Sequence, residues 1–191
     1  MNHEPCAMKA EPSGERVVLQ TERLRLRTLT LDDVDLVLGV FSDPVAMRHF
    51  RSTLDRGQTI ERIQRNLDRY RTDGYGLWAC IRLDDGEYLG NCGLLKQEVN
   101  GRDYIEVGYH FLRRHWGRGY ASEAATACRD HAFRTLGVDE VISLIVPANE
   151  PSIRVAQRNG MTRRFQTRKW DEHLGVHMIT RAEWEAMERT V

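Results

Sequence analysis

The chain has 191 residues, a length typical of one domain and sufficient to bury a sizeable core. Its 28 Lys and Arg residues balance its 28 Asp and Glu residues, so no net charge favours nucleic acid or a charged membrane surface as a partner. No stretch approaches the run of about 20 apolar residues that a membrane-spanning helix needs. We therefore expect a soluble single domain without nucleic-acid or membrane partners, and composition leaves both a monomer and a homodimer open.

Cysteine use and the N-terminal segment indicate the cellular environment. Four cysteines lie far apart in the sequence: Cys6, Cys80, Cys92 and Cys128. They form no C-x-x-C pair, which argues against a zinc ribbon and a disulfide framework and favours reduced thiols in a cytoplasmic protein. The first residues are polar, include two prolines and lack the apolar core of a signal peptide, so we predict a flexible tail over residues 1–16 and one domain over residues 17–187.

The first elements are a strand and two helices. Residues 17–28 alternate between apolar side chains on one face and arginines on the other, which predicts a half-buried strand. Acidic residues at 32 and 33 precede apolar residues at helical spacing, which predicts a short helix through Val40. A second helix is predicted over residues 59–71, where apolar residues recur on one face until two glycines interrupt the pattern.

Three strands follow in a row, joined by two turn signals. We predict them over residues 77–83, 88–95 and 104–112. Asp85-Gly86 separates the first two, and Asn100-Gly101 separates the second from the third. Both dipeptides favour tight hairpins, so the three strands should be antiparallel neighbours.

The pattern then changes to the helical period. Over residues 119–136, alanine, cysteine and phenylalanine recur on one stripe, and Gly137 supplies a C-cap. Residues 141–146 form a continuous apolar run, as expected of a strand buried on both faces. A strand, a long helix and another strand in succession predict a crossover connection.

The last part of the chain predicts a short helix and a final hairpin. Asn149 can cap a helix that ends at Asn159-Gly160. Strands are predicted over residues 162–170 and 173–180, followed by a turn of helix around Trp184. The elements together indicate an α/β protein whose strands are mostly antiparallel.

The most informative stretch lies where the strand over residues 104–112 ends and the long helix begins. It consists of Arg113-Arg114-His115-Trp116-Gly117-Arg118-Gly119-Tyr120-Ala121. A helix N-terminus presents unpaired N–H groups and a partial positive charge, and glycines let that backbone approach an anion closely. With its arginines, the turn fits a pyrophosphate; taken alone, an ordinary turn with solvated arginines explains it equally well.

Two other phosphate-binding patterns fit less well. A P-loop needs Gly-Lys-Ser or Gly-Lys-Thr, and neither occurs in the sequence. A dinucleotide fingerprint needs a third small residue at the Ser122 position and an acid after the next strand, but Asp139 and Glu140 precede the strand over residues 141–146. A dinucleotide-dependent oxidoreductase therefore stays only as an alternative.

The glycine turn and its surroundings resemble a known family. Arg114-x-x-Gly117-x-Gly119 is similar to the (Gln or Arg)-x-x-Gly-x-(Gly or Ala) signature of GNAT acetyltransferases. Four further stretches resemble the branch of the family that contains the ribosomal-protein N-terminal acetyltransferases. They are Glu106-Val107-Gly108-Tyr109, residues 116–124, Asn149-Glu150-Pro151-Ser152 and Asn159-Gly160-Met161. The resemblance spans roughly residues 17–187. It implies a single-domain GNAT fold, a mixed and mostly antiparallel sheet of about seven strands with a splayed parallel pair, flanked by helices.

The resemblance also implies acetyl-coenzyme A as the cosubstrate. By position, Phe111 and Leu112 are expected to bond the pantetheine arm between the two splayed strands. Asn149 is expected to bond the pantetheine while it caps its helix. The implied pyrophosphate contacts come from the turn and the first helical residues: Arg114, Gly117, Arg118, Gly119, Tyr120 and Ala121.

The implied reaction needs a neutral amine, because a protonated amine has no lone pair to attack the thioester. Glu106 is the best candidate for the base, since burial within the apolar strand would raise the pKa of its carboxyl towards a usable value. The alternation of that strand, taken alone, slightly favours a solvent-facing glutamate.

Departure of the coenzyme A thiolate is the second chemical step. Many GNAT enzymes use a tyrosine four residues after the serine of this segment, but Ala156 occupies that position. Ser152 is the remaining local proton donor, although it is also an ordinary first-turn helix residue. Cys92 and Cys128 fit small core residues better than an acetyl-cysteine intermediate, so direct transfer is expected.

The function expected from the sequence is acetyl transfer to a primary amine, on a protein N-terminus or a small molecule. A coenzyme-A-binding module without turnover is the second alternative, because the usual tyrosine is missing. No metal is expected, since His173 and His177 lie on a predicted strand without accompanying carboxylates. No motif identifies the acceptor, because acceptor loops vary most.

Overall fold

The computed structural model describes residues 14–189. Most of the tail predicted over residues 1–16 lies outside the described residues. Its last two residues contact the sheet: the Arg16 N–H donates to Thr28 Oγ1 at 2.9 Å, and the Glu15 carboxylate lies 3.1 Å from Arg27 Nε. Each helix within the described residues is too short or too polar to span a bilayer.

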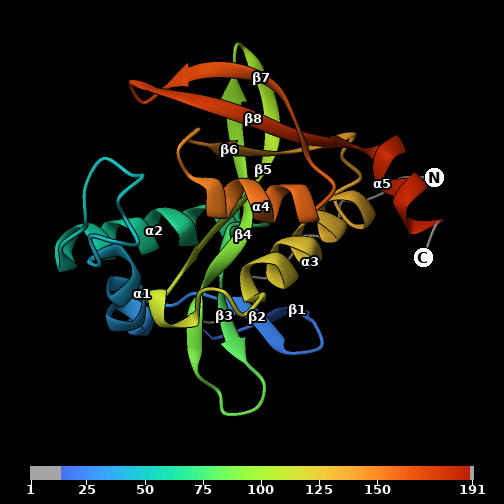
Figure 1. The fold of residues 1–191 in the computed structure, drawn as a ribbon. Helices are drawn as coiled ribbons and strands as arrows, with labels where there is room; N and C mark the ends of the chain where they lie inside the picture. Colours follow the sequence, from blue (N-terminus) through green and yellow to red (C-terminus); the bar gives the residue numbers. More distant parts are fainter. Residues whose placement is uncertain (1–13, 190–191) are drawn as a thin grey trace, which may run out of the picture.

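Residues 14–189 form one mixed sheet of eight strands, and five α-helices pack around it (Figure 1). The strands are β1 (Val17–Gln20), β2 (Leu24–Thr28), β3 (Leu77–Arg82), β4 (Tyr88–Val99), β5 (Arg102–Phe111), β6 (Glu140–Ile145), β7 (Thr162–Lys169) and β8 (Glu172–Thr180). The helices are α1 (Val34–Phe41), α2 (Arg56–Thr72), α3 (Tyr120–Arg134), α4 (Glu150–Arg158) and α5 (Arg181–Glu188), with short 3-10 turns at Leu31–Asp33 and Arg113–His115.

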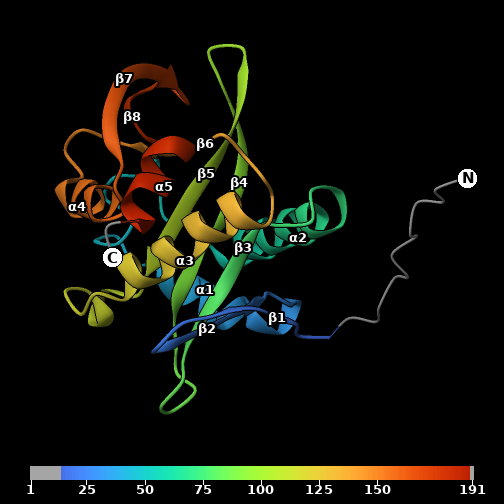
Figure 2. The ribbon, with the colours of Figure 1, turned by 90° about the vertical axis from the view of Figure 1, so that its right-hand side faces the viewer.

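The strand order is β1-β2-β3-β4-β5-β6-β8-β7. Neighbouring strands are antiparallel except β5 and β6, which are parallel and joined through α3. The predicted crossover and the predicted row of three antiparallel strands are therefore confirmed. Figure 2 shows α3 crossing the sheet beside the long β4–β5 hairpin.

The two faces of the sheet bury separate apolar clusters. Along β3, Trp78 and Cys80 pack in the cluster that includes α3, whereas Ala79 and Ile81 pack in the cluster that includes α1 and α2. This follows from the period of two in a strand, which sends successive side chains to opposite faces. Because β5 lies in the middle of the sheet, its successive side chains likewise face α3 or the α1–α2 side.

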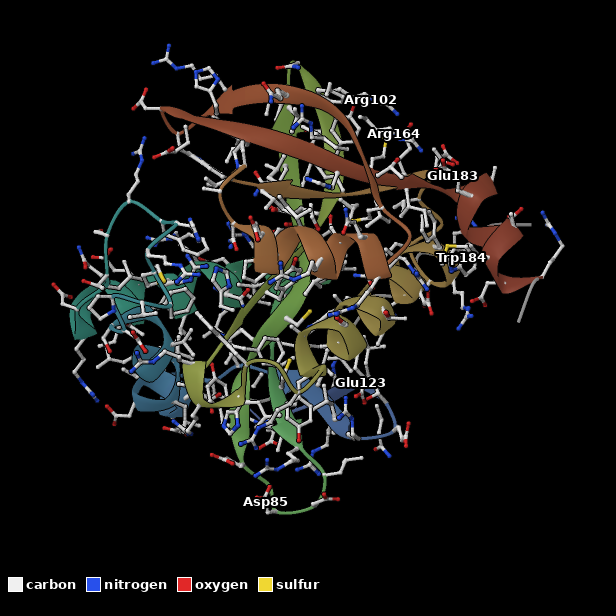
Figure 3. All side chains as sticks on the ribbon, in the orientation of Figure 1. Asp85, Arg102, Glu123, Arg164, Glu183 and Trp184 are labelled. Carbon is white, nitrogen blue, oxygen red and sulfur yellow. The ribbon has the colours of Figure 1, made fainter. Side chains whose placement is uncertain are left out.

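The first predicted strand is two strands, which raises the total to eight from the predicted seven. The turn between β1 and β2 closes through a hydrogen bond from the Thr21 N–H to the Leu24 carbonyl (2.8 Å). Glu123 on α3 holds this turn from the side, accepting from Thr21 Oγ1 at 2.6 Å and from the Arg23 N–H at 2.9 Å (Figure 3). A helix distant in sequence thus fixes a turn that contains neither glycine nor proline.

The arginine face predicted for this segment is partly buried. Leu24 and Leu26 are fully buried, as the alternation predicts, but Arg27 on the opposite face is only 8% exposed. Its guanidinium donates two hydrogen bonds of 2.7 Å to the Asp33 carboxylate, which is 4% exposed. A buried bidentate pair of this kind satisfies both charges, which explains why an arginine can occupy a core position.

Asp33→Ala should therefore lower the free energy of unfolding by about 3 kcal/mol, because it removes the buried carboxylate of the pair and leaves the Arg27 guanidinium only the exposed Glu15 carboxylate and the Thr28 carbonyl. Asp68→Ala is the matched control, since Asp68 pairs with Arg71 on the exposed face of α2 and should change stability by less than about 1 kcal/mol. Urea unfolding of both variants measures the difference. Equal losses in the two variants would contradict the importance of the buried pair.

Candidate active site

The parallel strands β5 and β6 separate soon after they pair. Backbone pairing joins only residues 105–106 to residues 141–142. One residue later, the Ser143 hydroxyl donates to the Val107 carbonyl at 2.9 Å, so a side chain replaces the ladder bond. Beyond this point β5 continues to Phe111 paired with β4 but with no backbone pairing on its β6 side, which leaves a wedge-shaped split in the sheet.

Backbone groups of alternate β5 residues face this split. In an antiparallel ladder, residues alternate between bonding to the partner strand and turning away from it. The Leu112 N–H donates to the Leu89 carbonyl at 2.9 Å, so by the register Tyr109 and Phe111 turn their backbone groups away from β4 and towards the split. Of the two residues predicted to bond pantetheine through their backbone, only Phe111 turns its amide towards the split. The Leu112 amide is bonded to Leu89 of β4, and the backbone of Tyr109 faces the split instead.

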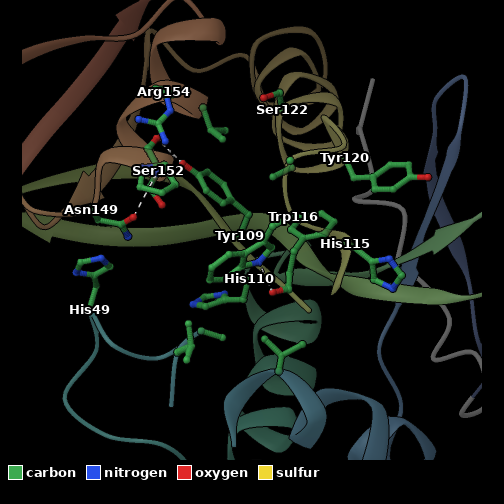
Figure 4. A pocket seen from close by; sticks show the side chains of 18 of the residues that line it. His49, Tyr109, His110, His115, Trp116, Tyr120, Ser122, Asn149, Ser152 and Arg154 are labelled. Atoms are coloured by element: carbon green, nitrogen blue, oxygen red, sulfur yellow. Dashed lines mark hydrogen bonds between the residues drawn. The ribbon is translucent and has the colours of Figure 1, made fainter. Parts of the chain in front are cut away.

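A cavity of about 430 Å³ opens at the split. Figure 4 shows its walls, with Tyr120 and His115 on one side of the view and His49 and Asn149 on the other. The glycine turn and the first turn of α3 contribute Trp116, Gly117, Gly119, Tyr120, Ala121 and Ser122; α4 and the residue before it contribute Asn149, Pro151, Ser152, Arg154, Val155 and Arg158. Among the predicted site residues, Glu106, Leu112, Arg114 and Arg118 do not line this cavity.

The glycine turn has the backbone conformation that its sequence predicts. Gly117 has φ +75° and Gly119 has φ +84°, angles that residues with a side chain rarely adopt. Gly119 is the N-cap of α3, so the free N–H groups of the first helical turn lie beside the cavity. A side chain at Gly117 would meet no protein atom within 4 Å, which leaves open space above the turn.

The two arginines predicted to contact the pyrophosphate, Arg114 and Arg118, do not line the cavity. Arg114 donates to Glu87 Oε1 from Nε and Nη2, both at 3.1 Å, which holds its guanidinium at the β3–β4 turn. The Arg118 carbonyl accepts from Arg23 Nη1 at 3.1 Å. In their place Arg154 and Arg158, one turn apart on α4, face the cavity, and helical spacing of two arginines after Asn149 is the sequence signal that could have found them.

Glu106 lies at the base of the split and is 9% exposed. Its Oε2 accepts from Gln97 Nε2 at 2.7 Å, and its Oε1 accepts from the Leu144 N–H of β6 at 3.3 Å. The carboxylate thus occupies the position where ladder bonding between β5 and β6 stops. Burial raises the pKa of this carboxyl above its ordinary value, only partly offset by the two hydrogen bonds. The solvent-facing alternative is therefore wrong, and the predicted burial is confirmed.

Two side chains meet at the first turn of α4. Asn149 Oδ1 accepts from the Ser152 N–H at 3.3 Å, which confirms that Asn149 is an N-cap. The Tyr109 hydroxyl donates to the Ser152 carbonyl at 2.9 Å and ties β5 to α4 across the split (Figure 4). Ala156 is fully buried one turn later, so Tyr109 and Ser152 carry the hydroxyl groups at this wall of the cavity.

A model of the acetyltransferase (GNAT) domain family matches residues 23–162, which include the split strands, the glycine turn and α4. The chain is a GNAT acetyltransferase. The uncharacterized protein YkkB of Bacillus subtilis (strain 168) is 38% identical over 160 residues, which cover 83% of this chain and 93% of YkkB.

Other GNAT proteins extend the comparison. The uncharacterized N-acetyltransferase p20 of Bacillus licheniformis is 33% identical over 160 residues, which cover 79% of this chain and 88% of p20. RimL, a ribosomal L7/L12 α-N-protein acetyltransferase solved with coenzyme A, shares the fold with a TM-score of 0.73 at 16% identity, over 86% of this chain and 98% of RimL. The predicted family and fold are confirmed, and acetyltransferase membership replaces the dinucleotide alternative.

The opposite wall of the cavity in this GNAT protein was missed by sequence reasoning. Residues 45–50, in the segment between α1 and α2, line the cavity together with His110 of β5. Arg51 anchors this segment to the tip of the β7–β8 hairpin, where Nε donates to the Trp170 carbonyl at 3.0 Å and the guanidinium lies 3.0 Å from Asp171. The segment has no periodic pattern, so no local signal marked it as part of the site.

The three cysteines within the described residues of this GNAT protein occupy its core. Cys92 and Cys128 are fully buried between β4 and α3, with their sulfur atoms 3.6 Å apart, and neither lines the cavity. Burial raises the pKa of the Cys128 thiol, which disfavours the nucleophilic thiolate. Their positions support the core assignment made from the sequence.

Proposed function

We propose that this GNAT enzyme transfers the acetyl group of acetyl-coenzyme A directly to a primary amine. The observation that carries the proposal is the split between β5 and β6, with the buried Glu106 carboxylate at its base and the glycine turn lining the cavity that opens at the split. The split supplies backbone groups of Tyr109 and the Phe111 N–H for an extended ligand, while the Phe111 carbonyl accepts from Trp116 Nε1 at 2.8 Å. The helix N-terminus supplies N–H groups for an anion. The cavity at the split therefore supplies an anion site, and the buried carboxylate lies at the base of the same split.

Coenzyme A fits the residues on the α3 and α4 side of the cavity. We assign its pyrophosphate to Gly117, Gly119 and the first turn of α3, where positive φ angles bring N–H groups close to the ligand. The pantetheine arm is assigned to the backbone of Tyr109 and Phe111 and to the Asn149 side chain. Acetyl-coenzyme A supplies an activated thioester carbonyl in this position.

The transfer balances as one substitution at the carbonyl. The amine lone pair forms a bond to the thioester carbon, the carbon–sulfur bond breaks, and the sulfur leaves as a thiolate. The amine proton passes to the Glu106 carboxylate, directly or through one water. Burial raises the pKa of this group, which brings it closer to the pKa of a useful general base. The thiolate takes a proton from solvent, directly or relayed by the Ser152 hydroxyl at the α4 wall, which regains its own proton from solvent, and a thiol pKa near 8.5 makes the step undemanding.

Two measurements on the purified chain test the proposal together. Isothermal titration should detect coenzyme A binding, and a thiol-release assay should detect consumption of acetyl-coenzyme A that depends on an added amine. The amine panel includes a peptide with a free N-terminus, free amino acids, a polyamine and an aminoglycoside. Binding without amine-dependent thiol release would indicate a coenzyme-A-binding module and would overturn the proposed activity.

A further inference from the structure

The end of the cavity opposite the glycine turn carries no acidic side chain. Its walls are residues 45–50 and His110, and none of the described residues that line the cavity is Asp or Glu. Arg48 is the permanently charged side chain at this end. Its Nε lies 3.2 Å from His49 Nε2, and its side chain is exposed to solvent at the mouth.

The two histidines of this wall do not offset or add to the charge of Arg48 at neutral pH. Burial, helped by Arg48, lowers the pKa of His49. Burial also lowers the pKa of His110 to about 3, and Arg62 of α2 adds to this effect from behind the wall. The His110 ring lies 4.9 Å from Phe41 and 5.1 Å from Phe50, and its Nδ1 is buried without a hydrogen-bond partner. Both imidazoles are therefore neutral.

Carboxylates near the mouth are already engaged by arginines. Asp43, Asp171 and Glu150 each lie within 3.4 Å of an arginine nitrogen. Glu106, at the base of the split, accepts from Gln97 and from the Leu144 backbone. Among residues 14–189, the carboxylates thus leave the positive charge of Arg48 without an ionic partner.

This distribution of charge selects among amine acceptors. A polycation brings several positive charges to a wall that holds a positive charge and no acid, so its binding is opposed electrostatically. An amine that also bears a carboxylate can place the carboxylate against the planar guanidinium of Arg48, which binds such groups through paired hydrogen bonds. The amine of such an acceptor can then lie within the cavity that Arg48 lines.

We propose that the acceptor is an amine with a carboxylate close to its nitrogen, and that Arg48 binds this carboxylate. The inference rests on the proposed acetyl transfer and deepens it, because it names the acceptor class of the same cavity. A free amino acid and a peptide that begins with an acidic residue share this chemistry. Arg48 is then a specificity-determining residue, since it acts on the acceptor rather than on the reacting carbonyl.

Kinetics with matched acceptors test the inference. The acceptors are the twenty α-amino acids, their α-amides, dipeptides that begin with Asp or Asn, spermidine and kanamycin. Acetylation should be most efficient with acceptors that carry the carboxylate, and the amino acids or the Asp dipeptide identify its source. Arg48→Gln should raise KM for the preferred acceptor about 10-fold at nearly unchanged kcat, which is the loss expected for one charge-assisted hydrogen bond. KM for the matching amide should not change.

Controls separate this inference from the proposed function. Arg65→Gln removes an exposed arginine of α2 that does not line the cavity and should leave every KM unchanged. Preferred acetylation of spermidine or kanamycin, or an equal effect of Arg48→Gln on charged and amide acceptors, would overturn the inference while acetyl transfer stands. Coenzyme A binding without acetylation of any acceptor would overturn both.

Discussion

Gly117→Val is expected to weaken coenzyme A binding by at least about 100-fold, which corresponds to about 2.7 kcal/mol. The reason is steric: a side chain at this position meets no protein atom within 4 Å, so it projects into the space assigned to the pyrophosphate. Gly117 is a cleaner choice than Gly119, where the first side-chain carbon would already lie 3.3 Å from Arg23 Nη2. Isothermal titration measures the affinity.

Backbone strain needs a separate control, because Gly117 has φ +75° and any side chain there costs conformational energy. Gly101→Val introduces a comparable strain at φ +80°, in the β4–β5 hairpin turn, again with no atom within 4 Å. It should bind coenzyme A like the parent. Arg118→Ala should weaken binding less than about 10-fold, because an exposed arginine adds only a screened contact. Unchanged affinity in folded Gly117→Val would remove the assignment of the turn to the pyrophosphate.

Features encoded by neighbouring residues could be predicted from the sequence. Asn100-Gly101 specifies its hairpin because both residues adopt positive φ, and Asn149 specifies the start of α4 because its side chain bonds a backbone N–H three residues later. The start of α2 at Arg56, three residues before the predicted boundary, follows from a capping box of Asp55 and Gln58. That signal is also local and could have been used.

Features that depend on distant contacts could not be predicted. The turn between β1 and β2 is held by Glu123, and the burial of Arg27 depends on Asp33 in the following turn. In the site, Arg114 is held by Glu87 rather than beside the helix N-terminus. Sequence spacing placed these side chains near the right element, but their directions are decided by partners that pattern reasoning cannot see.

A second feature that the sequence does not predict is which backbone amides of a strand bond the partner strand and which turn away from it. Phe111 and Leu112 both end the strand over residues 104–112, and the sequence alone gives no reason to prefer one amide. The register with β4 decides it, because the Leu112 N–H bonds the Leu89 carbonyl and the groups of Tyr109 and Phe111 face the split. Knowledge of the cross-strand partner is therefore needed to choose backbone contacts for a ligand.

Glu106→Gln should lower turnover by about 100-fold or more while leaving coenzyme A affinity unchanged, the usual range for loss of a general base. The substitution keeps the local hydrogen bonds, because the Gln97 amide can reverse and the Leu144 N–H still meets a carbonyl oxygen. Glu98→Gln is the matched control, since Glu98 is on the same hairpin and its side chain accepts from the Gly101 N–H at the exposed end. It should turn over like the parent.

The dependence on pH separates a base from a structural residue. Burial raises the pKa of Glu106, so the folded protein favours its neutral form; the associated stability is present below the ordinary pKa and is lost as pH rises through the raised value. Glutamine does not ionise, so the Glu106→Gln variant does not lose this stability as pH rises. It should be at least as stable as the parent at pH 8, measured by thermal unfolding. Its turnover should recover relative to the parent as pH rises from about 6 to 9, because more of an α-amine acceptor is already neutral. A loss that is the same at every pH, or no loss at all, would show that Glu106 is not the base, and the amine would then lose its proton to solvent.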